Sequence, residues 1–195
     1  MNVTAVNDIH TGGVTISGTP TQGQKLTAIN TLADVDGMGT VSYLWKADGT
    51  AITGANSSSY TLTQAEVGKK ITVVASYTDG GNTPESASSS ATAVVANIND
   101  APTGGVSISG VASVGNTLTA VTSNLKDADG LGALKYQWVA DDTIIAGATG
   151  STYVLTKAEV GGPVHVVVSY TDLGGAKESV SSANTVYVTN AAMST

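Results

Sequence analysis

The chain has 195 residues, no cysteine and a formal net charge of −7. The lack of cysteine excludes disulfides and thiolate metal sites, and scattered lysines in an acidic chain argue against nucleic acid as a partner. No apolar run approaches the roughly 18 residues of a membrane-spanning helix, so we expect no membrane insertion. No basic and then apolar stretch follows Met1, so we expect no signal peptide at this end.

The sequence contains the same segment twice. GGVTISG at Gly12 recurs as GGVSISG at Gly104, and YLWKADGTAITGA around Trp45 recurs as YQWVADDTIIAGA around Trp138. The offset is 92 residues between the glycines and 93 residues between the tryptophans, so one residue has been inserted between these points. A repeat of this length is a whole domain rather than one turn of a solenoid. Two near-copies are typical of a piece of a longer array.

Period-two alternation of apolar and polar residues predicts strands throughout each repeat. In repeat one the expected strands cover residues 14–17, 26–28, 41–46, 51–52, 60–62, 71–78 and 86–95. Asp48-Gly49 is a hairpin signal, and residues 64–68 are the only helix-like piece, at most one turn. Repeat two follows the same pattern. Seven short strands with turn signals between them predict a two-sheet sandwich in each repeat.

The predicted fold class is therefore all-β, with two tandem sandwich domains arranged end to end. We place the first domain at residues 1–98 and the second at residues 99–195. Each core is expected to form around its single tryptophan. The predicted core residues are Leu26, Tyr43, Trp45, Leu62, Ile71 and Val73 in repeat one, and Leu118, Tyr136, Trp138, Leu155, Val164 and Val166 in repeat two.

A family resemblance rests on the tryptophan of the third strand and on the stretch GANSSSYTLTQAEVG that follows it. This pattern resembles the immunoglobulin-like repeats of bacterial surface proteins. The combination of NDAPTGGVSISG, DADGLG and YQW is similar to repeats of large RTX-type adhesins that Gram-negative bacteria export by type I secretion. The resemblance implies extender modules on the bacterial cell surface that hold a distal adhesive region away from the cell. It also implies a monomer whose partners are neighbouring repeats, with calcium at the domain junctions.

The acidic residues concentrate in a few loops. Asp34 and Asp36 form D-x-D-G, and Asp127 and Asp129 repeat it. Alternate carboxylates before a glycine suit a hard cation such as calcium, although D-x-D-G is also an ordinary turn. In a sandwich, the start of the first strand, the loop after the second and the loop before the last share one end. Asn-Asp-Ala-Pro at the junction also resembles the calcium-binding linker of cadherins.

We therefore predict calcium at the junction and an equivalent, incomplete N-terminal site that lacks a glutamate from a preceding repeat. The candidate junction ligands are Glu66, Asn97, Asn99, Asp100, Asp127, Asp129 and Asp172. The candidate N-terminal ligands are Asn7, Asp8, Asp34, Asp36 and Asp79. The alternative is a solvated acidic rim of hydrogen-bonded turn aspartates.

No pattern in the sequence indicates an enzyme. There is no G-x-S-x-G elbow, and His10 and His165 have no histidine partner and no counterpart in the other repeat. The glycine pairs lie in turns rather than between a strand and a helix, so they are not phosphate loops. Two other functions stay open. One is a module that itself binds a glycan or protein, hinted at only by Tyr187, and the other is an accessory domain of a secreted polysaccharide-degrading enzyme.

The first prediction concerns the connection between the repeats. The linker near residues 96–102 is short, and Pro102 restricts Ala101 to extended geometry. Folding the two domains back on each other would need a longer, glycine-rich tether, so small-angle X-ray scattering should show an elongated particle. A globular scattering profile would contradict the end-to-end arrangement.

Overall fold

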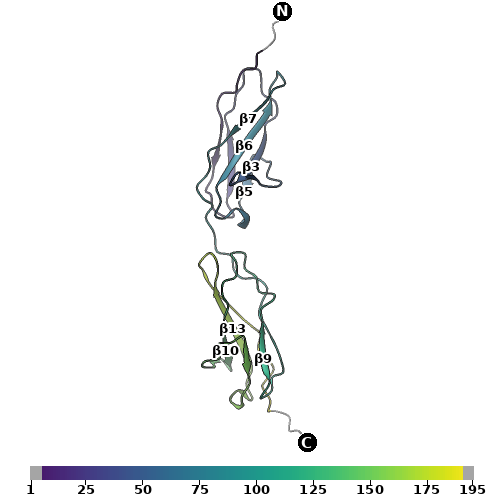
Figure 1. Cartoon of the computed structure of the whole chain (residues 1–195), viewed down its shortest axis with the longest axis vertical. Coiled ribbons are helices and arrows are strands. Elements are labelled where there is room, and N and C mark those ends of the chain that lie inside the picture. The colour runs from purple at the N-terminus through teal and green to yellow at the C-terminus, as the bar shows by residue number, and fades with distance from the viewer. Residues whose placement is uncertain (1–5, 191–195) are drawn as a thin grey trace, which may run out of the picture. The chain divides into compact units, whose positions relative to one another are not determined.

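A computed structural model describes residues 6–190 of the chain. The chain divides into two compact units, Met1–Ile98 and Asn99–Thr195, which we call unit 1 and unit 2. Both are all-β, with two antiparallel sheets facing each other as in immunoglobulin-like sandwiches (Figure 1). Within residues 6–190 there is no helix long and apolar enough to cross a membrane.

Unit 1 has a three-stranded and a four-stranded sheet. The strands are β1 (Val14–Ser17), β2 (Lys25–Asn30), β3 (Ser42–Ala47), β4 (Thr50–Ala51), β5 (Ser59–Thr61), β6 (Ile71–Thr78) and β7 (Pro84–Ser88). The sheet orders are β1-β2-β5 and β4-β3-β6-β7. A single turn of 3₁₀ helix, η1 (Gln64–Glu66), lies between β5 and β6.

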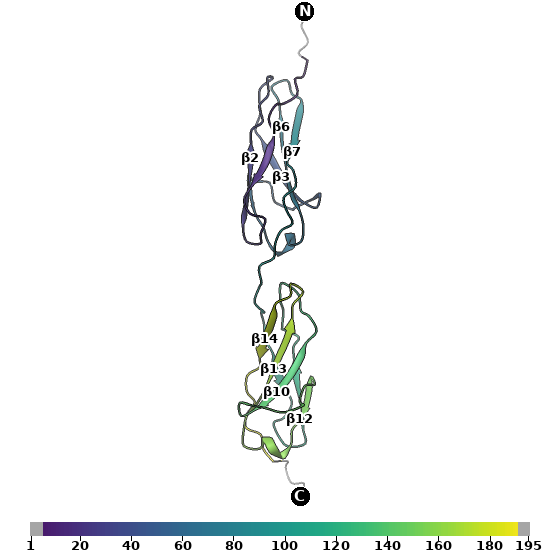
Figure 2. The same ribbon diagram turned by 90° about the vertical axis from the view of Figure 1, so that its left-hand side faces the viewer.

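Unit 2 repeats this topology, and Figure 2 shows β10, β13 and β14 side by side. Its strands are β8 (Ser107–Ser109), β9 (Thr117–Val121), β10 (Lys135–Ala140), β11 (Thr143–Ile144), β12 (Thr152–Val154), β13 (Val164–Thr171) and β14 (Lys177–Ser181). The sheet orders are β12-β9-β8 and β11-β10-β13-β14. The 3₁₀ turn η2 (Lys157–Glu159) matches η1.

The long central strands show how alternation builds the sandwich. Along β6 every second residue from Ile71 to Tyr77 is buried, while the residues between them face outward half-exposed. Successive strand side chains point to opposite faces, so one face of β6 enters the core. β3 pairs with β6 in the register Trp45↔Val73, which places the tryptophan beside the centre of that face.

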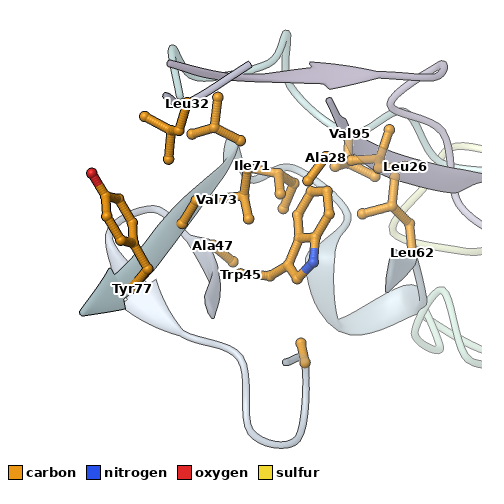
Figure 3. Close-up of a cluster of buried hydrophobic side chains, with 13 residues drawn as sticks. Leu26, Ala28, Leu32, Trp45, Ala47, Leu62, Ile71, Val73, Tyr77 and Val95 are labelled. Atoms are coloured by element: carbon orange, nitrogen blue, oxygen red, sulfur yellow. The ribbon is translucent and has the colours of Figure 1, made fainter. Parts of the chain in front are cut away.

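Each core is centred on its tryptophan, as the sequence predicts. The Trp45 side chain is fully buried among Leu26, Leu62 and Val73 (Figure 3). Its indole N–H donates to the Ser57 carbonyl oxygen at 2.9 Å, so the polar edge of the ring is satisfied. In unit 2 Leu118, Trp138, Leu155, Val164 and Val166 are buried in the same way. The predicted core is thus confirmed, with Tyr43 and Tyr136 partly buried against it.

The last strand of each unit is shorter than the sequence predicts. β7 ends at Ser88, whereas the expected strand continues to residue 95. The reason is that side chains interrupt the ladder: Ser89 Oγ accepts from Val73 N at 3.0 Å and Thr92 Oγ1 accepts from Ile71 N at 3.0 Å. In unit 2, Ser182 and Thr185 accept from Val166 and Val164 in the same positions. The chain thus stays beside β6 without forming a regular strand.

The second prediction tests the tryptophan core. Trp45→Ala should lower the free energy of unfolding of unit 1 by about 3–5 kcal/mol, because it opens a large cavity and removes a satisfied indole. Trp138→Ala should do the same for unit 2. Differential scanning calorimetry on the full chain checks both, with exposed Leu44→Ala as the control. A Trp45→Ala chain that melts like the parent would show that the core is assigned wrongly.

Candidate cation-binding site

The acidic loops lie at one end of each sandwich, because the strands that they connect begin or end there. In unit 2, residues 122–134 connect β9 to β10 and carry Asp127 and Asp129, while Asp172 directly follows β13. The segment before β8 reaches the same end, because Asp100 N donates to Asp129 Oδ2 at 2.7 Å. Segments up to 72 positions apart in sequence therefore contribute carboxylates or backbone to one place.

Three carboxylates converge at this end of unit 2. Asp127, Asp129 and Asp172 each present an oxygen within 4.8 Å of the others, and residues 6–190 contain no second such group. Asp129 and Asp172 are buried, at 6% and 5% exposure. Two negative charges 4.8 Å apart repel by about 3 kcal/mol at an effective dielectric constant of about 20. The arrangement is therefore stable only with compensating donors or a cation.

Hydrogen bonds compensate part of this charge and fix the side chains. Asp127 Oδ1 accepts from Asp129 N at 2.9 Å, and Asp127 Oδ2 accepts from the Tyr170 hydroxyl at 2.6 Å. Asp172 Oδ1 accepts from Ala176 N at 2.7 Å. These are charge-assisted bonds, which are shorter and stronger than neutral ones. They hold the carboxylates in fixed orientations.

One oxygen of the cluster is left without a hydrogen bond. Asp172 Oδ2 is buried and has no hydrogen-bond partner. An unsatisfied buried charged oxygen is costly, so it needs an explanation. A cation at the three converging carboxylates would supply one. Calcium takes six to eight oxygen ligands at about 2.3–2.6 Å, and carboxylates are its preferred protein ligands. The donor set is all oxygen and lacks nitrogen and sulfur, so it fits calcium in chemistry.

The acidic end of unit 1 has nearly the same hydrogen bonds as the acidic end of unit 2. Asp8 N donates to Asp36 Oδ2 at 2.8 Å, and the Tyr77 hydroxyl donates to Asp34 Oδ2 at 2.6 Å. Asp79 Oδ1 accepts from Thr83 N at 2.6 Å, while its buried Oδ2 again has no hydrogen-bond partner. The three carboxylates of unit 1 nevertheless do not form a close triad like that of unit 2.

The tyrosines that donate into these clusters are themselves buried, with 5% of Tyr77 and 3% of Tyr170 exposed. Burial, followed by the hydrogen bond and the charge of Asp34, raises the pKa of Tyr77 well above its usual range. Burial and the Asp127 carboxylate raise the pKa of Tyr170 in the same way. Each tyrosine therefore remains a protonated donor at neutral pH and holds its aspartate in place.

Each acidic end also has one glutamate that the sequence pattern does not predict. Glu85 lies opposite Tyr77 in the β6–β7 register, and Glu178 lies opposite Tyr170 in the β13–β14 register. Glu178 Oε1 accepts from Asn99 Nδ2 at 2.9 Å, and Glu85 Oε1 accepts from Asn7 Nδ2 at 3.0 Å. The available signal was their shared position, eight residues after each tyrosine.

His10 marks a difference between the two units. Its Nδ1 lies 2.9 Å from Glu85 Oε2, which is a half-buried ion pair when the histidine is protonated. The hydrogen bond from His10, with that from Asn7, lowers the pKa of Glu85. Unit 2 has Pro102 at the corresponding position, so this pair occurs only in unit 1.

Two predicted ligands lie elsewhere in unit 1. Glu66 is the last residue of η1, at the far end of β6 from Asp79, and eight residues of strand span about 26 Å. Its Oε2 accepts from Thr63 N and Thr63 Oγ1 at 2.9 and 2.8 Å, so the carboxylate closes a capping box. Asn97 is exposed near the end of unit 1. Their roles as ligands of unit 2 stay predictions.

Comparisons with known proteins find sequence similarity to an outer capsid protein. No family model matches it. The chain is 32% identical over 128 residues to the highly immunogenic outer capsid protein of Enterobacteria phage T4, covering 64% of this chain. The chain spans 34% of the length of that relative, or about one third.

Solved structures also match most of the chain. The three N-terminal domains of the bacteriophage RB49 Highly Immunogenic Outer Capsid protein match 87% of this chain and 58% of theirs, with 19% identity and a TM-score of 0.31. The Clostridium thermocellum CbhA fibronectin(III)-like modules match 93% of this chain and 97% of theirs, with 17% identity and a TM-score of 0.30. Scores at this level do not separate one family from another.

The third prediction follows from the raised pKa values of the two tyrosines. The stability that their hydrogen bonds contribute is fully present below pH about 10, the unfolded value, and is lost as pH rises through the raised folded values. Tyr77→Phe/Tyr170→Phe should therefore melt lower than the parent at pH 8 but lose less stability between pH 9 and 11.

Thermal melts across this pH range check the expected difference. Tyr187→Phe is the control for the loss of a phenol, because Tyr187 is 67% exposed. Equal pH slopes in the parent and in the double variant would show that the tyrosine–aspartate bonds contribute nothing to stability.

Proposed function

We propose that this chain is a surface-displayed spacer of tandem immunoglobulin-like modules, stiffened by calcium bound at the acidic end of each module. The observation that carries the display role is the 32% identity with an outer capsid protein over 128 residues. Repeated sandwiches with individual cores are also the usual building blocks of spacers, because length grows with each added domain. We assign the chain no catalytic role of its own.

Two carriers fit this proposal. The sequence relative favours the outside of a capsid, and the resemblance to RTX-type repeats favours an adhesin on the bacterial cell surface. In both, the modules project a more distal region that makes the specific contact. We favour the capsid, because the relative is a match over 64% of this chain rather than a motif resemblance.

The acidic end of unit 2 is the candidate calcium site. Asp127, Asp129 and Asp172 would supply carboxylate oxygens, and the buried free oxygen of Asp172 is already placed among them. A bound calcium ion would supply positive charge that offsets the repulsion of the three carboxylates. Asp129 also accepts from Asp100 N, so fixing this carboxylate would restrain the segment that enters unit 2. The proposed stiffening depends on this link.

An extracellular location would suit calcium binding of moderate affinity. Calcium sites of extracellular modules have dissociation constants of about 10⁻⁴–10⁻³ M. Such a site would be empty in a low-calcium cytosol and filled outside the cell. At a free concentration of about 100 times the dissociation constant, binding would stabilise a unit by about 2.7 kcal/mol.

Labelling intact particles and cells tests the display role. Antibody raised against the chain should decorate intact phage particles in immunogold electron microscopy, if the capsid is the carrier. Decoration of intact bacterial cells instead would favour the adhesin carrier. Signal that appears only after lysis would rule out surface display.

The fourth prediction tests calcium itself. We expect 5 mM calcium chloride to raise the melting temperature of the full chain relative to chelator, and Asp127→Asn/Asp129→Asn to reduce that rise, because the carboxylate ligands of unit 2 are lost. Asp141→Asn/Asp142→Asn is the matched control: it removes the same charge from an exposed turn with positive φ, which asparagine tolerates.

Calorimetry separates binding from a general charge effect. The control chain should keep the full calcium response of the parent. If parent, site variant and control melt alike with and without calcium, the acidic loops are ordinary turns and the spacer is a passive one.

A further inference from the structure

One of the differences between the two acidic ends lies next to the third carboxylate. Asp79 is followed by Gly80 in unit 1, and Asp172 is followed by Leu173 at the corresponding position of unit 2. The flanking residues match closely, with SYTD before the position and a glycine directly after it in both units. The structure shows that this exchange changes how the two acidic loops meet.

In unit 1, Gly80 joins the two acidic loops through its backbone N–H. Gly80 N donates to the carbonyl oxygens of Asp36 and Gly37, both at 3.1 Å. A Cβ atom built on Gly80 would lie 2.2 Å from the Asp36 carbonyl oxygen, which no side chain could tolerate. Only glycine therefore allows this approach, and the two carbonyl oxygens it occupies are of the kind that a hard cation uses.

In unit 2 leucine prevents the same closure. No backbone hydrogen bond joins Leu173 to the loop of Asp129 and Gly130 in the described part of the chain. The Leu173 side chain lies against Gly130 instead, so close that a Cβ on that glycine would be 2.7 Å from Leu173 Cδ1. Asp129 in this loop is buried, whereas its counterpart Asp36 is half-buried.

The carboxylates follow this difference. Where the loops are fastened by Gly80, Asp34, Asp36 and Asp79 do not form a close triad, and where Leu173 stands, the three counterparts lie within 4.8 Å of one another. Each unit has a buried aspartate oxygen without a hydrogen bond, so a cation would satisfy a buried acceptor in both. What differs is whether the other ligands are already gathered around it.

We infer that the residue after the third aspartate sets the calcium affinity of each unit, so that unit 2 with Leu173 holds the tighter site and unit 1 with Gly80 the weaker one. The inference rests on the proposed calcium role of the acidic ends. Calcium binding in unit 1 must break or rearrange the Gly80 bonds, and binding in unit 2 carries no such cost. The loss of this one shared hydrogen bond corresponds to a difference of up to about tenfold in dissociation constant.

Isothermal titration of the full chain with calcium chloride measures each site separately. Asp34→Asn/Asp36→Asn leaves the unit 2 site, and Asp127→Asn/Asp129→Asn leaves the unit 1 site. We expect the first chain to bind calcium about tenfold more tightly than the second. Equal affinities, or tighter binding by unit 1, would overturn the inference while leaving the proposed calcium role intact. Absence of binding in both chains and in the parent would overturn both.

Exchanges at the deciding position test the cause. In the background that leaves the unit 2 site, Leu173→Gly should weaken calcium binding about tenfold, because the loops can then fasten as in unit 1. Leu173→Ala is the matched control: it keeps a Cβ that blocks closure, so it should retain most of the affinity. Equal loss in both variants would show that the leucine acts only by covering the site, which contradicts the closure mechanism.

The reverse exchange completes the test. In the background that leaves the unit 1 site, Gly80→Leu should tighten calcium binding, because its Cβ forces the loops apart. The melting temperature in chelator shows whether unit 1 still folds, and if it does not, the Leu173→Gly and Leu173→Ala pair decides. A folded Gly80→Leu chain with unchanged affinity would count against the inference.

Discussion

Repulsion among buried carboxylates is the constraint on which the acidic ends depend. Three negative groups within 4.8 Å of one another would separate in water, and here the fold holds them together. It does so with donors that cannot move away: the backbone N–H groups of Asp100, Asp129 and Ala176. Because these donors belong to segments anchored by β8, β9 and β13, the stability of the sandwich keeps the charges close.

The tyrosine hydroxyl connects this charge cluster to the core. Tyr170 lies on the inner face of β13, in line with Val164, Val166 and Val168, so its ring packs with the core while its hydroxyl reaches Asp127. Unit 1 places Tyr77 in the same way, and Figure 3 shows its hydroxyl pointing away from the Trp45 cluster. A change in the acidic loop therefore acts on the end of the central strand, and not on the loop alone.

Much of the fold could be predicted from the sequence, because alternation reports directly which face of a strand is buried. The tryptophan cores and the single 3₁₀ turn follow from local pattern alone. The sharing of one end by Asp100, Asp127, Asp129 and Asp172 followed from the order of strands in a sandwich. Strand order predicts which residues share an end of the sandwich, but it does not predict the distances between their side chains.

The remaining features depended on contacts that local pattern does not reveal. Glu178 looks like any solvent-facing strand residue until the β13–β14 register sets it opposite Tyr170. Ser89 continues the alternating pattern of the last strand, yet its hydroxyl accepts the Val73 N–H in place of a backbone carbonyl. Glu66 is predicted as a ligand because it is acidic and near the junction, and the structure adds that it closes a capping box with Thr63, three residues earlier.

Because the chain has no disulfide, a cation at the acidic ends would matter more for its stability. Small extracellular domains commonly rely on disulfides, because a core of this size leaves a stability of only about 5–15 kcal/mol. This chain has none, and its cores rest on one tryptophan each with small aliphatic neighbours. A cation contributing about 2.7 kcal/mol would be a substantial share of that stability. Unlike a disulfide, the proposed calcium ion would act only where calcium is plentiful, so carboxylates that repel one another without calcium would stabilise the chain when calcium is bound.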